Sequence, residues 1–370
     1  MEPHKEAIYC IALTMIPGIG MVSAKRLIET AGGAFEAFSN FNQLLLKAKS
    51  KMPPLQNPAG VLHAAENLYH NSIQNNISVI PFCDINYPNR LKECEDSPIL
   101  LYYKGQSNLN KSKIVSIVGT RNMTQYGERF CDDLITSLAE FDKEITIVSG
   151  LAYGVDITAH KRALKDNLET IAVLAHGLDI IYPYNHRSIA SKIIEQGGLL
   201  SEYPIGVFPD RYHFVSRNRI IAGLSDATII IESATKGGAL ITADLANEYN
   251  RECFALPGRY QDPFSAGCNK LIKENKAQII ESSIDLIEAM NWGKSQTPKQ
   301  KDTQLSLFTQ NLTKEESIVI QQMRGKGAIS IDYLAQVTQL EVYKLHPILF
   351  ELEMKGIIRA SGGSSYQLEK

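Results

Sequence analysis

Short apolar runs alternate with helical stretches through the middle of the chain. The runs are rich in β-branched residues and mostly lack the apolar–polar alternation of a half-exposed strand, which is typical of strands covered on both faces. Because helical stretches separate them, the pattern predicts an α/β fold with a doubly wound, mostly parallel sheet. The predicted strands cover residues 114–118, 145–148, 170–174, 199–200, 227–231, 253–256 and 279–280.

The N-terminal part of the chain has a different pattern. Apolar residues between positions 7 and 28 recur at helical spacing, so residues 1–75 are predicted to form a helical domain of the helix-hairpin-helix or SAM-like type. The sequence Ile-Pro-Gly-Ile-Gly at 16–20 resembles a helix-hairpin-helix turn, whose glycines leave N–H groups free for a phosphate. A tight connection that contacts no ligand is an equally good interpretation.

The C-terminal part begins with a polar segment. Residues 293–312 contain few helix or strand signals and are predicted to be a linker. Thr313 and Glu316 then have the spacing of a capping box at the start of a helix. Residues 313–370 have the layout of a small winged-helix domain, and residues 76–292 form the predicted α/β domain.

Composition excludes several classes of protein. The formal net charge is −2, so any site for a polyanion must be a local patch. The six cysteines contain no C-x-x-C pair, which argues against a disulfide framework or a structural metal site and fits a reducing compartment. No apolar run reaches about 18 residues and no secretion signal is evident, so we expect a cytoplasmic protein without a membrane span.

An Arg-Asn-Arg run lies before the predicted strand 227–231, in a segment predicted to be a loop. Guanidinium groups hold phosphates with two parallel hydrogen bonds. Two of them, two residues apart, cannot both be buried cheaply, so either they bridge carboxylates inside the fold or at least one faces a polyanion. The run consists of Arg217, Asn218 and Arg219, and Phe214 beside it is a candidate platform for stacking a base.

Glycine-containing turns follow three of the predicted strands. The carboxyl ends of strands are where open α/β sheets bind ligands, and backbone N–H groups at a helix start hold phosphates. The first turn lacks the G-x-G-x-x-G pattern, so we expect no nicotinamide or flavin cofactor. A plain β–α turn remains the alternative for the first of these turns. The candidate positions are Gly119, Thr120, Arg121, Ser149, Gly150, Lys236, Gly237 and Gly238.

Two other groups of polar residues have structural alternatives. Asp156 and His160 follow a serine, but the segment lacks the G-x-S-x-G pattern of a hydrolase, and an i,i+4 pair on a helix is the favoured interpretation. Tyr182, Tyr184 and His186 follow the third strand and either stack on bases or pack locally.

Taken in order, several strings between residues 80 and 280 resemble the bacterial DNA-processing protein A (Smf) family. They include SIVGTRNMTQYG at 116–127, VSGLAYGVDITAH at 148–160, FVSRNRIIAGLS at 214–225 and GCNKLI at 267–272. The resemblance implies an extended Rossmann-like core that binds single-stranded DNA without strong sequence preference. It also implies a homodimer that protects incoming DNA and loads a RecA-type recombinase in natural transformation.

The resemblance also assigns binding positions, and one of them departs from the family pattern. The implied DNA contacts are Arg121, Phe214, the Arg-Asn-Arg run and Lys236. The usual family turn after this lysine is Ser-Gly-Ser, whereas this chain has Gly237-Gly238-Ala239. Backbone N–H groups would therefore carry any phosphate contact in that turn.

The sequence thus predicts a binding protein rather than an enzyme, without cofactor or metal ion. The main alternative is a nucleotide or nucleoside-phosphate hydrolase on the same scaffold, with Glu202 or Glu232 as its carboxylate. A third hypothesis is a scaffold protein whose winged helix docks a protein or duplex DNA.

Overall fold

Seven adjacent parallel strands, from β6 to β9, make up most of a nine-stranded sheet. The first of them along the chain, β3 (Ile114–Val118), lies in the middle, with β4, β5 and β6 on one side and β7, β8 and β9 on the other. This order places a topological switch point between β3 and β7. The predicted doubly wound sheet is confirmed. Its other parallel strands are β4 (Thr146–Ser149), β5 (Thr170–Leu174), β6 (Gly198–Ser201), β7 (Ala227–Ile230), β8 (Glu252–Ala255) and β9 (Gln278–Ile279).

The strand prediction missed two antiparallel strands. β2 (Leu100–Gly105) pairs with β6, and β1 (Ser78–Pro81) pairs with β2. Both precede the strand–helix alternation and are joined to each other through the short helix α6 (Asn89–Lys92). A search for alternating strands and long helices therefore passes over them, although the first half of β2 is as apolar as the parallel strands.

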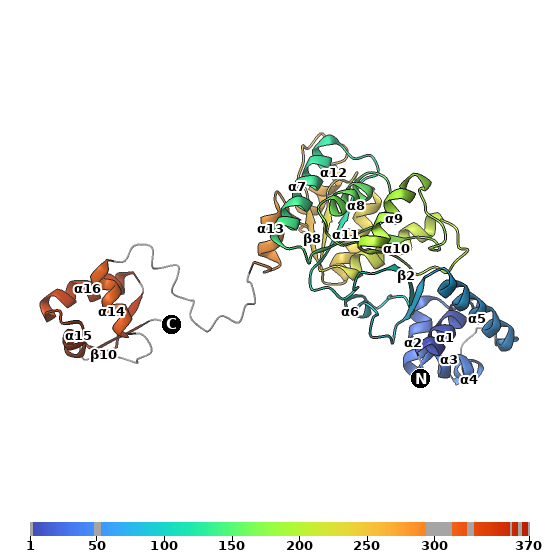
Figure 1. Cartoon of the computed structure of the whole chain (residues 1–370), viewed down its shortest axis with the longest axis horizontal. Helices are drawn as coiled ribbons and strands as arrows, with labels where there is room; N and C mark the ends of the chain where they lie inside the picture. The colour runs from blue at the N-terminus through green and yellow to red at the C-terminus, as the bar shows by residue number, and fades with distance from the viewer. Residues whose placement is uncertain are drawn as a thin grey trace. The chain divides into compact units, whose positions relative to one another are not determined.

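The computed structural model describes residues 3–47, 53–293, 313–323, 329–355, 357–361 and 365–368. These residues belong to two units, Met1–Gly293 and Lys294–Lys370 (Figure 1). Residues 294–312 of the predicted linker lie outside the described part. No described helix combines the length and the apolar character needed to cross a membrane.

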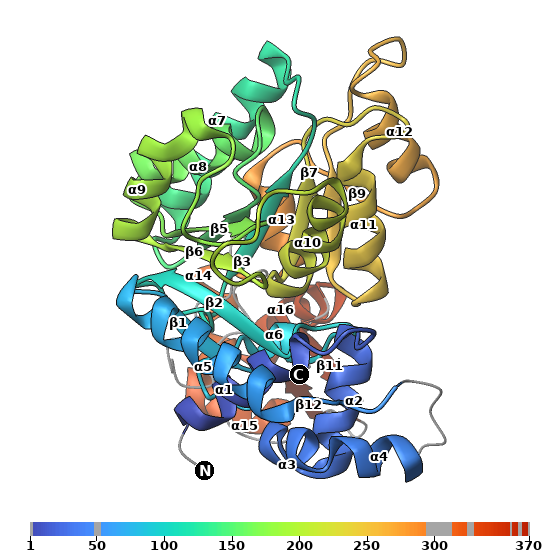
Figure 2. The same cartoon turned by 90° about the vertical axis from the view of Figure 1, so that its right-hand side faces the viewer.

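Helices cover both faces of the sheet (Figure 2). Alternate residues of β3 face opposite sides, so that Ile114 and Val118 pack in one hydrophobic cluster and Val115 and Ile117 in another. The first cluster includes α10 (Arg211–Leu224), α11 (Gly238–Glu248) and α12 (Ala266–Lys273). The second cluster includes α7 (Gln125–Phe141), α8 (Val155–Lys165) and α13 (Ser283–Ala289). The remaining helical elements of the sheet region are η1 (Tyr184–His186) and α9 (Arg187–Gln196).

Five helices precede the sheet and pack against it. They share one hydrophobic cluster with sheet residues such as Tyr102 and Leu199, so they belong to the same unit as the sheet. Gly18, in the turn between the first two, has a φ of 86°, which glycine adopts without steric cost. The boundary after residue 75 and phosphate binding by this turn remain predictions. The helices are α1 (Pro3–Thr14), α2 (Met21–Ala31), α3 (Ala34–Ser39), α4 (Phe41–Lys47) and α5 (Pro58–Gln74).

The second unit is the predicted winged-helix domain. Thr313 and Glu316 form the predicted capping box, in which the Thr313 amide donates to Glu316 Oε2 at 2.7 Å and the Glu316 amide donates to Thr313 Oγ1 at 3.2 Å. Three helices pack around a cluster of their own. They are α14 (Lys314–Met323), α15 (Ile331–Thr338) and α16 (Val342–Met354), with a three-stranded sheet of β10 (Ile329–Ser330), β12 (Ser365–Leu368) and β11 (Ile358–Ala360).

Candidate functional site

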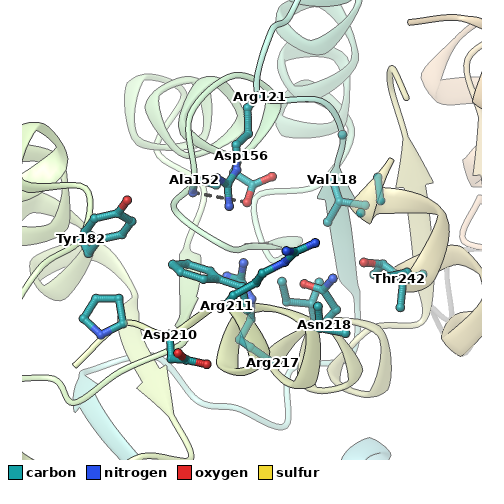
Figure 3. Close-up of a pocket in the computed structure, with 18 of the residues that line it drawn as sticks. Val118, Arg121, Ala152, Asp156, Tyr182, Asp210, Arg211, Arg217, Asn218 and Thr242 are labelled. Atoms are coloured by element: carbon teal, nitrogen blue, oxygen red, sulfur yellow. Dashed lines mark hydrogen bonds between the residues drawn. The ribbon is translucent and has the colours of Figure 1, made fainter. Parts of the chain in front are cut away.

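A pocket of about 750 Å³ opens at the switch point of the sheet. It is lined by the turn after β3, the segment that starts α8, one side of α10 and the first turn of α11. Figure 3 shows Arg121 and Asp156 on one side of the pocket, with Arg211, Arg217 and Asn218 of α10 on the other. The carboxyl ends of the central strands therefore meet several guanidinium groups, at the end of the sheet where open α/β sheets bind ligands.

An exposed arginine and two aromatic rings lie side by side in the lining of this pocket. The guanidinium carbon of Arg121 lies 5.5 Å from the centre of the Phe214 ring, within cation–π range. The Phe214 ring lies 5.8 Å from that of Tyr182, and 47% of Tyr182 is exposed. A cation and a partly exposed ring side by side can hold a phosphate and stack the base attached to it.

Arg217 lies at the base of the pocket and is 4% exposed. Its Nη1 donates hydrogen bonds to the carbonyl oxygens of Gly150, at 2.8 Å, and Val173, at 2.5 Å. Burial raises the pKa of the neighbouring Asp156 carboxyl, and the positive charge of Arg217 opposes that rise. Arg217 Nε has no hydrogen-bond partner among the described residues. The arginine thus keeps one unsatisfied donor beneath the pocket.

The Arg-Asn-Arg run is helical, which corrects the predicted loop. Positions 217 and 219 are about 200° apart on helix α10, so their side chains leave the helix on opposite sides. Arg219 points away from the pocket and forms a buried ion pair with Glu202. Arg219 therefore bridges a carboxylate inside the fold, the first of the two predicted alternatives, whereas Arg217 is buried against backbone carbonyl oxygens. Asn218 lies between them and lines the pocket.

The turn after β3 contributes one glycine and one arginine to the pocket. Gly119 lines the pocket, and a Cβ atom there would collide with Val155. Thr120 is not among the lining residues, and its amide donates to the carbonyl oxygen of Glu232 at 2.7 Å. The structure therefore brings Gly119 and Arg121 to the pocket and uses the Thr120 amide to join β3 to β7.

The turn after β4 has a packing role. Ser149 is fully buried, and its hydroxyl donates to the carbonyl oxygen of Ile117 at 2.6 Å. Gly150 accepts the hydrogen bond from Arg217, and a Cβ atom at this glycine would overlap the guanidinium. The structure does not place either residue in the pocket lining. Glycine is required at position 150 because the Arg217 guanidinium occupies the space that a side chain would need.

The turn before α11 is only partly in the pocket. Gly238, the first residue of α11, lines the pocket, and a Cβ atom there would meet open space. The Gly237 amide donates to the carbonyl oxygen of Ala234 at 2.9 Å, so this amide closes the turn. Lys236 is exposed and lies outside the lining. The first amides of α11 are the backbone donors at this rim.

Asp156 and His160 do not form the predicted helical pair. Asp156 Oδ2 accepts a hydrogen bond from the Ala152 amide at 3.3 Å, whereas His160 Nδ1 lies 2.7 Å from Thr170 Oγ1. Complete burial lowers the pKa of His160 to about 3, so this histidine is neutral. The structural role predicted for His160 agrees with these contacts, although its partner lies on β5.

Sequence reasoning missed Arg211 and Phe208, which both line the pocket. Arg211 is the first residue of α10, after Asp210, whose side chain accepts a hydrogen bond from the Tyr212 amide at 2.8 Å. An aspartate at that position signals a helix start. Counting from it, positions 211, 214 and 218 fall on one helical face, which would have identified Arg211.

The two carboxylates of the hydrolase hypothesis are engaged elsewhere. Glu202 pairs with Arg219, and Glu232 accepts hydrogen bonds from the amide and the hydroxyl of Thr124 at 2.8 and 2.5 Å. Neither glutamate lines the pocket. Asp156 is therefore the buried carboxylate of this site, and its charge faces Arg217.

Cations at the two ends of the parallel strands differ in whether they form ion pairs. At the end where the parallel strands begin, three cations form ion pairs of 2.5–2.7 Å. At the opposite end, Arg121, Arg211 and Lys236 are exposed and form no ion pair with any described residue. The paired cations are Arg90 with Asp226, Lys111 with Glu144 and Lys113 with Asp142. Unpaired charge thus gathers where the pocket opens.

Comparison with known proteins agrees with this architecture. Residues 78–291 match the family model described as DNA recombination-mediator protein A, and residues 307–364 match the DprA winged helix domain. The chain belongs to the DNA recombination-mediator protein A family. Protein Smf of a Synechocystis species is 31% identical over 98% of this chain and 99% of its own length. DNA processing protein DprA of Streptococcus pneumoniae is 41% identical over 54% of this chain and 70% of its own length.

Two solved structures of the family are similar to this one. DNA processing protein A from Streptococcus pneumoniae has a TM-score of 0.58 and 32% identity, covering 73% of this chain and 98% of its own. The second structure concerns the single-stranded DNA binding mode of DNA processing protein A from Helicobacter pylori. It has a TM-score of 0.53 and 32% identity, covering 59% of this chain and 96% of its own. The family resemblance predicted from the sequence is confirmed.

Proposed function

We propose that this chain is a single-stranded DNA-binding recombination mediator and that the pocket at the switch point receives the DNA. The observation that carries the proposal is that Arg121 and Arg211, two exposed arginines without an ion-pair partner among the described residues, line the pocket together with the Phe214 ring. The single-stranded DNA binding mode described for the Helicobacter pylori relative supports the choice of ligand.

In this proposal the two exposed arginines bind successive phosphates, and the first amides of α11 supply further donors near Gly238. A base stacks on Phe214, with Tyr182 beside it. Arg217 shapes the base of the pocket and directs positive charge toward it. Stacking and phosphate contacts do not distinguish bases, so we expect little sequence preference. The proposed DNA contacts do not include Thr120, Ser149 or Arg219, because these residues form hydrogen bonds within the protein.

Binding of fluorescent single-stranded and duplex oligonucleotides tests the proposal. We expect tighter binding of the single strand, with a slope of log affinity against log salt of about −0.7 per phosphate contacted. The variant Arg121→Ala should weaken binding and reduce the slope by about one such contact. Lys273→Ala is the matched control, because Lys273 is also exposed but lies at the far end of α12. Equal affinity for duplex, or a response that is independent of salt, would refute the proposal.

We further propose that the chain acts by loading a RecA-type recombinase and does so as a homodimer in the cytoplasm. Membership of a recombination-mediator family supports the first part. The chain should accelerate recombinase assembly on single strands that are already covered by a single-strand-binding protein. Light scattering during gel filtration gives its oligomeric state. If recombinase assembly is not accelerated at any ratio of this chain to recombinase, the loading role is wrong, whereas the DNA-binding proposal is unaffected.

We propose that the site binds without turnover. The glutamates that a hydrolase would use pair with Arg219 and Thr124, outside the pocket. Incubation with single-stranded DNA or nucleoside phosphates, with magnesium or manganese added, should leave both unchanged. Turnover that persists through repurification and disappears in Asp156→Asn would instead identify an enzyme that uses this pocket.

A further inference from the structure

A second hollow, of about 560 Å³, lies at the carboxyl ends of the parallel strands, as the pocket does. It is lined by Tyr126 at the start of α7 and by the loop after β8, including Pro257, Arg259 and Asp262. The strand between β3 and β8 is β7, and the turn that leaves β7 contains the exposed Lys236. The pocket, this lysine and the hollow therefore follow one another along the carboxyl ends of three adjacent strands.

The base of the loop after β8 is held in place by hydrogen bonds. The Tyr126 hydroxyl donates to the carbonyl oxygen of Pro257 at 2.7 Å. Asn269 brackets Gly258, because its Oδ1 accepts from the Gly258 amide at 3.2 Å and its Nδ2 donates to the Gly258 carbonyl oxygen at 2.9 Å. These contacts fix the residues immediately before Arg259 and Tyr260, which reduces the entropy lost when the loop binds a ligand.

The side chains carried on this fixed base are exposed and of the types that bind nucleic acid. Tyr260 is 86% exposed, and half of Tyr126 is exposed. Arg259 is exposed, and so is Arg129, which lies one helical turn after Tyr126 on the same face of α7. Neither arginine forms an ion pair with any described residue. The lining itself contains one positive charge, Arg259, and one negative charge, Asp262. Burial, followed by the negative charge of Glu281, raises the pKa of the Tyr126 hydroxyl, so Glu281 also lies close to the hollow.

We propose that this hollow is a second subsite for single-stranded DNA, so that a strand bound in the pocket continues past Lys236 to the loop after β8. Arg259 and Arg129 bind phosphates of the continuing strand, and a base stacks on Tyr260. The proposal rests on the proposed function, since it extends the same ligand beyond the first site. It also predicts that the DNA leaves the pocket on the side of β8 and not on the side of β5.

Oligothymidylates of two lengths, about 6 and about 20 nucleotides, separate the two sites in a binding assay on the full chain. The double variant Arg259→Ala/Tyr260→Ala should lose at least about tenfold in affinity for the long probe, because one stacked base accounts for about tenfold and a phosphate contact is lost as well. Its affinity for the short probe should stay unchanged. Tyr260→Phe keeps the ring and should bind the long probe as the unmodified chain does.

The opposite direction provides the matched control. Tyr184 and Arg187 are also exposed, and they lie on the other side of the pocket, after β5. Tyr184→Ala/Arg187→Ala should bind both probes normally. Selective loss of long-probe affinity in this control, with none in the Arg259→Ala/Tyr260→Ala variant, would overturn the proposal and send the strand the other way.

Two further outcomes would also overturn it. Equal losses for both probes in the Arg259→Ala/Tyr260→Ala variant would mean that the loop shapes the first pocket. Unchanged binding of both probes would mean that the strand does not reach the loop. If the unmodified chain binds neither probe, the proposed function itself is wrong, which is a separate result. Unfolding temperatures of all variants check that these exposed substitutions leave the fold intact.

Discussion

The guanidinium of Arg217 occupies the space into which a side chain at position 150 would project, and Gly150 also accepts its hydrogen bond. We predict that Gly150→Ala destabilises the chain by about 1–3 kcal/mol, because the new methyl group forces the buried arginine or its helix to move. Urea unfolding measures the effect. Gly20→Ala is the control, since a Cβ atom at Gly20 meets open space. Similar losses in both variants would contradict the overlap.

The buried pair of Arg219 and Glu202 makes a prediction that depends on pH. Burial raises the pKa of the Glu202 carboxyl, and Arg219 opposes that rise. Arg219→Ala should therefore raise this pKa further and leave a buried, unpaired charge, which costs about 3–5 kcal/mol near neutral pH. Because the folded-state pKa is raised, the lost stability should be largest above it and should shrink as the pH falls and Glu202 binds a proton.

Unfolding of Arg219→Ala at a series of pH values measures this effect. Lys270→Ala breaks an exposed i,i+4 pair with Glu274 and should cost at most about 0.5 kcal/mol, independent of Glu202. A loss in Arg219→Ala that is constant from acidic to alkaline pH would show that Glu202 is not the titrating group.

Phe214 is predicted to act through its ring face. Phe214→Leu retains an apolar side chain on α10 but removes the surface on which a base stacks. We expect single-stranded DNA affinity to fall by roughly 1–3 kcal/mol, with little change in unfolding temperature. Phe350→Leu, on an exposed aromatic of the winged-helix unit, is the matched control. A large loss of stability in Phe214→Leu would indicate a packing role for the ring.

Removal of the winged-helix unit tests how independent the two units are. Each unit has its own hydrophobic cluster, so the chain ending at Gly293 should fold with an unchanged free energy of unfolding. Its affinity for a short single strand should stay within about 0.4 kcal/mol of that of the full chain, a factor of two. A folded truncation that no longer binds would assign part of the DNA site to residues 294–370.

The sheet was predictable from the sequence because its strands are buried on both faces. Residues 114–118 and 170–174 are apolar except for one small hydroxyl residue each, Ser116 and Thr170, and the strands have these same bounds. The site was only partly predictable. Whether Arg217 or Arg219 faces the pocket depends on the rotation of α10 about its axis, which a loop assignment hides. The partner that removes Arg219 from the pocket, Glu202, lies in a different loop and is identified only by the fold.

The exposed arginines of the pocket give a nearly neutral protein a local cluster of positive charge at the carboxyl ends of its central strands. With a formal net charge of −2, the chain as a whole is weakly repelled by a polyanion. The unpaired arginines at the pocket edge nevertheless turn that edge toward it during approach, and this orientation weakens as salt screens the field. Such a protein would be retained on a negatively charged chromatography matrix at low ionic strength, although its net charge has the same sign as the matrix.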